Sequence, residues 1–131
     1  MFGEAGRAVH EGVVELTFHA RHSELHEARQ TIGDSLGRQG IDSEHAWEVV
    51  AVVNELIAAV RECEITSPVA LTVTTYPLLT SVRLRCDQDV ELRDKPFDLR
   101  ERLLQHFAVA FGRRRRDDGS VDLWAEVARR R

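Results

Sequence analysis

The segment from Asp42 to Cys63 constrains the fold more than any other part of the chain. It contains no proline or glycine, and Asp42 or Ser43 can cap a helix, with Glu44 in the favourable first turn. Its length and caps favour a helix over a strand, although several of its apolar residues are β-branched. We therefore expect the most buried helix of the chain here, with a broad apolar face made of Ala46, Val49, Val50, Val53, Leu56, Ile57 and Val60 and widened by Ala51 and Val52.

A shorter helix is predicted directly before it. Ser23 can serve as the N-cap, and Gly37 and Gly40 can end the helix. Its single apolar stripe, with spacings of three and four residues, consists of Leu25, Ala28, Ile32 and Leu36.

Alternating apolar and polar residues predict strands over residues 13–20, 69–75, 79–86 and 120–128. Tyr76 and Pro77 separate the second and third strands, which are expected to form an antiparallel hairpin. A third helix is predicted from Asp98 to Gly112, followed by a turn over residues 113–119. Its apolar side chains at helical spacing are expected to be core residues.

The order of these elements is strand, helix, helix, strand, strand, helix, strand. It indicates an α+β fold, a two-layer α/β sandwich with an antiparallel or mixed sheet covered on one face by three helices. A chain of 131 residues is long enough for one domain with a single core. We expect a flexible leader over residues 1–12, the domain over 13–128 and a basic tail over 129–131.

The net charge of −4 argues against nucleic-acid binding by bulk charge. The arginine runs at 113–116 and 129–131 are interpreted as a solvated loop and a tail, with phosphate or nucleic-acid contact as the alternative. No apolar run has the length of a membrane span, and the two cysteines lack CxxC spacing. With no signal peptide in view, these features predict a cytoplasmic protein without a membrane partner.

Two consecutive helices, the second carrying Glu55-Leu56, followed by a hairpin, resemble the GHKL superfamily of histidine-kinase-like ATPases. The closest resemblance is to the compact anti-sigma-factor serine kinases of the RsbW-like type. Their second helix carries an N-box, E-L-x-x-N-A-x-x-H, with which the segment "AWEVVAVVNELIAAVREC" aligns without gaps. The terminal strand "SVDLWAEVA" also fits. The resemblance implies a Bergerat-type fold and places Glu55 at the catalytic-base position.

The nucleotide signatures of that family are altered in this chain. The magnesium-binding Asn of the N-box is replaced by Ala59, and a methyl group cannot coordinate a hard cation. The closing His is replaced by Cys63. Asn54 adjoins Glu55, so the two side chains point about 100° apart on a helix.

The two glycine-containing signatures are also altered. Asp87 stands where the family's adenine-binding Asp would be, but the following "QDVE" has no glycine. The alternative is an ordinary turn residue after a strand. The phosphate loop is replaced by "KPFDLRERLL", in which Asp98 and Glu101 would repel a phosphate.

The resemblance therefore implies a degenerate anti-sigma regulatory factor, a pseudo-ATPase without a metal or a required cofactor. Asn54, Glu55, Ala59 and Asp87 are its vestigial nucleotide positions, with Glu55 the vestigial base. The partners are a sigma factor or an anti-sigma antagonist, with a possible homodimer. The first helix and the loop 88–95 would bind these partners. The charged residues of the helix region that we expect at this surface are Arg21, Glu24, Arg29 and Arg38.

Two other hypotheses are open. An active ATP-dependent serine/threonine protein kinase would bind Mg-ATP through Glu55 and Asp87 and phosphorylate an antagonist. An unrelated two-layer α+β domain would share only the order of elements.

The histidines and the cysteines could form a metal site and a redox pair, but each group also has a simpler structural interpretation. His19, His22, His26 and His45 could suggest zinc, since His22 and His26 have i,i+4 spacing, but surface or strand-end histidines are the simpler interpretation. Cys63 and Cys86 are expected to be small buried apolar residues, with a redox pair as the alternative.

Overall fold

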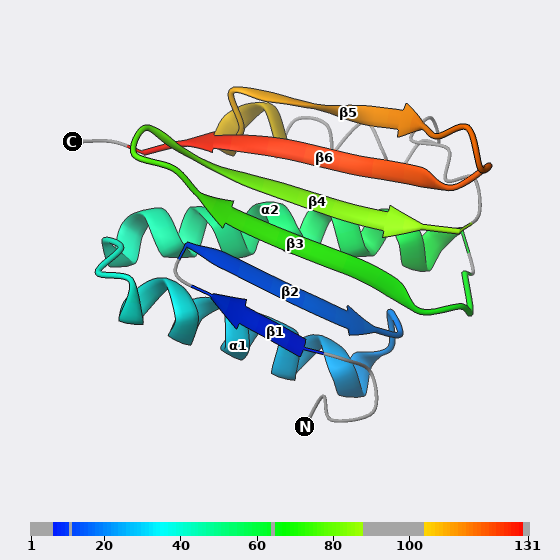
Figure 1. Ribbon diagram of the computed structural model, residues 1–131, viewed down its shortest axis with the longest axis horizontal. Coiled ribbons are helices and arrows are strands. Elements are labelled where there is room, and N and C mark those ends of the chain that lie inside the picture. Colours follow the sequence, from blue (N-terminus) through cyan, green and yellow to red (C-terminus); the bar gives the residue numbers. More distant parts are fainter. Residues whose placement is uncertain (1–6, 11, 64, 88–103, 130–131) are drawn as a thin grey trace.

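The protein is a two-layer α+β structure with one antiparallel sheet and helices on one of its faces (Figure 1). The computed structural model describes residues 7–10, 12–63, 65–87 and 104–129. The strands are β1 (Arg7–His10), β2 (Val13–Phe18), β3 (Val69–Thr75), β4 (Leu79–Cys86), β5 (Ala110–Arg115) and β6 (Val121–Ala128). The helices are α1 (His22–Arg38) and α2 (Ser43–Glu62), and residues 104–107 form a further helical turn.

The sheet has the strand order β1-β2-β3-β4-β6-β5, and every neighbouring pair is antiparallel. Both α1 and α2 lie behind the sheet as drawn in Figure 1. α1 packs on β2, and α2 packs on β4 and β6, so the most buried helix covers the centre of the sheet. This arrangement confirms the α+β class and the two-layer architecture.

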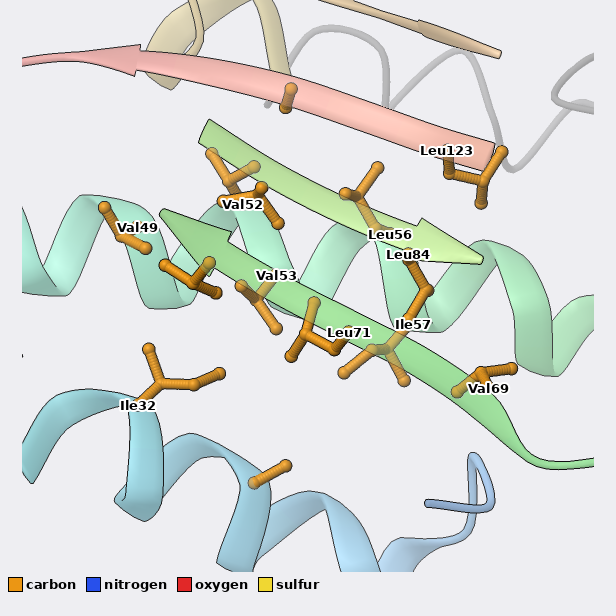
Figure 2. Close-up of a cluster of buried hydrophobic side chains, with 14 of the residues drawn as sticks. Ile32, Val49, Val52, Val53, Leu56, Ile57, Val69, Leu71, Leu84 and Leu123 are labelled. Carbon is orange, nitrogen blue, oxygen red and sulfur yellow. The ribbon is translucent and has the colours of Figure 1, made fainter. Parts of the chain in front are cut away.

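The core lies between α2 and the inward face of the sheet, where side chains of adjacent strands form continuous apolar rows. Strand register aligns Leu16, Leu71, Leu84 and Leu123 in one such row. Leu56 of α2 belongs to the same buried cluster, and Figure 2 shows its side chain between the helices and the sheet. The alternation in the strands and the three-to-four spacing in α2 therefore meet in one core.

The elements nearest this core match the sequence predictions most closely. β3 and β4 begin and end at the predicted residues, and β6 begins one residue later than predicted. α2 also has the predicted length, with Asp42 at the N-cap position but without a side-chain capping hydrogen bond. α1 begins after Arg21 rather than after a Ser23 cap, and Gly37 lies inside it. Gly40, with φ of 76°, follows its end.

The C-terminal prediction was wrong between residues 108 and 116. The expected third helix falls partly on residues 98–103, outside the described chain, and the helical turn 104–107 is followed by β5, not by more helix. β5 pairs with the outer edge of β6, and the hairpin turns at Gly119, whose φ is 88°. The arginine run is therefore mostly strand, and the predicted turn shortens to the residues around Asp117 and Asp118.

The leader prediction did not include β1, which pairs with β2 along four residue pairs. A strand of four residues is too short to show a period of two. Gly12, with φ of 79°, makes the turn between the two strands, and its carbonyl accepts a hydrogen bond from the Thr75 N–H at 2.7 Å.

We predict that Leu56→Ala lowers the free energy of unfolding by about 2–5 kcal/mol, because Leu56 is 1% exposed and its truncation leaves a cavity. The measurement is chemical denaturation. Leu78→Ala removes the same atoms from a side chain that is 65% exposed, and should change stability by less than about 0.5 kcal/mol. Equal losses in the two variants would contradict the placement of the core.

Candidate functional site

The candidate site lies on α2, where the family resemblance places the N-box. Asn54 faces α1, because Arg29 Nε donates a hydrogen bond to Asn54 Oδ1 over 2.6 Å. Glu55, one residue further, points about 100° away around the helix axis. Asn54 and Glu55 are thus directed to different sides of α2, and the structure does not bring the two polar groups together into one site.

Ala59 is one helical turn after Glu55, on the same side of α2. It is 3% exposed and belongs to the core cluster, whereas Glu55 is half-buried. The position that would carry a magnesium ligand is therefore occupied by a methyl group in contact with apolar neighbours. A hard divalent cation needs oxygen ligands, and Ala59 supplies none.

Asp87 follows β4 directly and is exposed. Its Oδ1 accepts a hydrogen bond from Ser67 Oγ at 2.5 Å, which links the end of β4 to the residues before β3. This contact joins two segments that are distant in sequence, and it leaves open both the adenine-anchor and the turn-residue interpretations of Asp87. The neighbouring loop 88–95 and the positions Asp98 and Glu101 lie outside the described residues.

Cys63 and Cys86 are both free thiols. Cys86 is fully buried at the end of β4, and burial, together with the nearby Asp87 and Cys63, raises its pKa to about 12. A thiol with so high a pKa stays protonated at neutral pH and is a poor nucleophile. This supports the interpretation of Cys86 as a small apolar core residue.

His45, on the first turn of α2, is the buried histidine of the described chain. Its Nε2 lies 2.7 Å from Thr80 Oγ1 of β4, in hydrogen-bonding contact. Its Nδ1 has no hydrogen-bond partner among the described residues, so a charged imidazole would bury an unpaired N–H. Burial lowers the pKa of His45 below the ordinary value of 6.5, and Arg129 lowers it further, against opposing effects of Glu48 and Asp42.

The zinc hypothesis gains no support from the described side chains. His19 Nδ1 lies 3.6 Å from Glu24 Oε2, an ion pair when the imidazole is protonated, and the side chain of His22 lies outside the described residues. His45 is engaged with Thr80. Within the described part of the chain, no group of three His, Cys, Asp or Glu residues could hold a metal ion.

Two features were missed by the sequence reasoning. Trp47 is 63% exposed on α2 and contacts Phe107 edge to face, with ring centroids 5.4 Å apart. Asp122 of β6 is buried and bonded to two arginines, with 3.1 Å from Arg85 Nε to Oδ1 and 3.2 Å from Arg116 Nη1 to Oδ2. A tryptophan among polar positions of α2 and an alternating Asp-Leu-Trp in β6 were the available signals.

Comparison with known proteins gives no family for this chain. No protein-family model matches the sequence, and no curated protein is significantly similar to it. In the described part of the chain, neither α1 nor α2 combines the length and the apolar character required to cross a membrane.

We predict that folding stability falls as the pH is lowered from about 7 to 5. Because the pKa of His45 is lower in the folded protein, the unfolded chain takes up the proton first, and protonation below pH 6.5 favours unfolding. The measurement is urea denaturation across this range for the native protein and for His45→Gln. The variant should lose less stability on acidification, and an identical pH dependence in both proteins would contradict the prediction.

Proposed function

We propose that the protein is a degenerate GHKL-type anti-sigma regulatory factor that binds its protein partner without ATP. Support comes first from the order of its elements, in which α1, α2 and the β3–β4 hairpin follow β2 and β6 lies near the end. This is the order on which the sequence resemblance rests. Because unrelated domains can share an order of elements, the residue arrangement on α2 must carry the functional argument.

The observation that carries the proposal is the state of two N-box positions, Glu55 and Ala59, and of Asn54, which directly precedes the N-box. Ala59 is sealed in the core, Asn54 is bound to Arg29 on α1, and Glu55 has neither of them as a metal-binding neighbour. A kinase of this family needs magnesium to position the triphosphate, so the loss of the ligand position favours a function that needs no phosphoryl transfer.

Protein binding is favoured by the outer surface of the helix layer. Arg21, Arg29 and Arg38 of the α1 region are exposed, and Trp47 presents an exposed ring on the adjacent helix. Tryptophan and arginine are the residues most enriched at the energetic centres of protein interfaces. The charged residues of α1 suit fast and specific capture, and Trp47 is the apolar anchor that the sequence reasoning lacked.

The alternative is an active ATP-dependent serine/threonine kinase with Glu55 as the base. In this alternative Glu55, which is half-buried, is the base, and Mg-ATP is bound through Glu55 and Asp87. This alternative requires magnesium to be held by other carboxylates or by water. The kinase alternative predicts that binding or phosphorylation of the partner depends on Mg-ATP. The pseudo-ATPase proposal predicts partner binding that does not depend on Mg-ATP.

The test is direct binding of purified sigma factors and anti-sigma antagonist domains from the same genome, measured by interferometry in EDTA without nucleotide. We expect one of them to bind, and Trp47→Ser to weaken that binding by at least about tenfold. Tyr76→Ser is the matched control, because Tyr76 is also exposed but lies at the β3–β4 turn, away from the helix layer. Binding that requires Mg-ATP would contradict the proposal, as would a panel in which no candidate binds.

A further inference from the structure

The second face of the sheet, opposite α1 and α2, is left open by the described elements (Figure 1). Strand alternation places the polar residues of β3, β4 and β6 on it, opposite the buried rows of the core. The register aligns Thr72 with Arg83 and Arg83 with Trp124 across the three strands. Arg83 and Trp124 are therefore cross-strand neighbours near the middle of the open face.

A shallow hollow of about 380 Å³ lies on this face beside Trp124. Threonine and serine residues supply hydroxyl groups to its lining, Tyr76 supplies a half-exposed ring, and Glu126 supplies a carboxylate. Its lining consists of Thr72, Thr74, Tyr76, Ser81, Arg83, Trp124 and Glu126. The hollow thus combines two aromatic rings with hydrogen-bonding groups of both kinds.

A glycine on the neighbouring strand leaves room for the Trp124 ring to lie against the sheet. Gly112 of β5 is paired with Trp124, and a Cβ atom at residue 112 would come within 3.1 Å of Trp124 Cζ2. The missing side chain lets the indole lie over β5. A ring held in this way costs little conformational entropy when a planar group stacks on it.

Arginines continue from the hollow toward the β5–β6 hairpin. Arg85 and Arg116 both bond to the buried carboxylate of Asp122, which fixes their guanidinium groups. The Asp118 carboxylate also lies near both arginines, which, after its hydrogen bonds with Ser120, help to lower its pKa, so the two cations are close to two carboxylates. Arg114 of β5 lies opposite Asp122 of β6 in the strand register, and its side chain is exposed. Arg83 and Arg85 lie two residues apart on β4, about 7 Å along the strand.

We propose that this open face binds single-stranded nucleic acid. A base stacks on Trp124 in the hollow, and the phosphates that follow are bound by Arg83 and by the arginines beside Asp122. Glu126 accepts a hydrogen bond from the exocyclic amino group of the base, which favours cytosine over thymine or uracil. A single strand contacts the Trp124 ring, the hydroxyl groups of the hollow and the arginines at the same time.

An acidic protein segment is the competing occupant. It would satisfy the arginines, but it would be repelled by Glu126 and would leave Trp124 without a stacking partner. The expectation from net charge does not decide the matter, because the −4 belongs to the whole chain and α2 alone carries Glu44, Glu48, Glu55 and Glu62. The open face carries Arg83, Arg85 and Arg114 together with Glu15, Asp122 and Glu126, so phosphate binding there rests on the positions of the arginines and not on an excess of charge.

The test uses Trp47→Phe, in which Trp124 is the sole tryptophan and is excited selectively, titrated with a deoxycytidine dodecamer in low salt. We expect saturable quenching of the Trp124 emission, weaker binding of a thymidine dodecamer and of duplex DNA, and an affinity that falls as salt is raised. Arg83→Ser in this background should weaken binding several-fold and reduce the salt slope by about 0.7. Arg61→Ser, the matched loss of an exposed arginine on α2, should leave binding unchanged.

Four results would overturn the inference. The first is that no single strand quenches the Trp124 emission, and the second is an equal loss of affinity in the Arg61→Ser and Arg83→Ser variants. The third is polyglutamate binding as tight as that of the deoxycytidine dodecamer. The fourth is equal binding of the two dodecamers, which would remove the role of Glu126. Polyglutamate binding would identify the face as a protein surface. None of these results bears on the helix layer, so the proposed anti-sigma function stands or falls separately.

Discussion

The packing of α2 against β4 and β6 is the constraint on which the rest of the molecule depends. Its apolar face is buried across the centre of the sheet, and that burial fixes the rotation of the helix about its own axis. The rotation then decides where every other side chain of α2 points. Ala59 must enter the core, and Asn54 must face α1, where Arg29 binds it. The proposal that α2 does not bind magnesium or nucleotide rests on these two placements.

The sequence could predict the parts of the fold whose periodicity is set by this core. The broad apolar stripe of α2 and the alternation in β3 and β4 repeat often enough to identify all three elements and their ends. β1 is too short to show alternation, and β5 consists largely of arginines that indicate a solvated turn. β5 exists because the edge of β6 accepts a partner, which is a tertiary effect that no local pattern contains.

The candidate site was predictable in part for the same reason. The alanine at residue 59, where the resembled family has a magnesium ligand, is visible in the sequence, and the angle between Asn54 and Glu55 follows from helix geometry. The bond from Arg29 to Asn54 and the bond from Ser67 to Asp87 join distant parts of the chain, so only the structure reveals them. The two faces of the molecule also emerge only in the fold, with exposed Trp47 on the helix layer and Trp124 on the open sheet.

The most direct test of the central proposal, that α2 does not form part of a nucleotide site, is a thermal melt with and without a large excess of Mg-ATP. A ligand present at about 100 times its Kd adds about 2.7 kcal/mol of stability, which raises the Tm of a domain of this size by several degrees. The account predicts the same Tm in both conditions, for the native protein and for Glu55→Ala alike. A rise of several degrees that disappears in Glu55→Ala would contradict it and would restore the kinase.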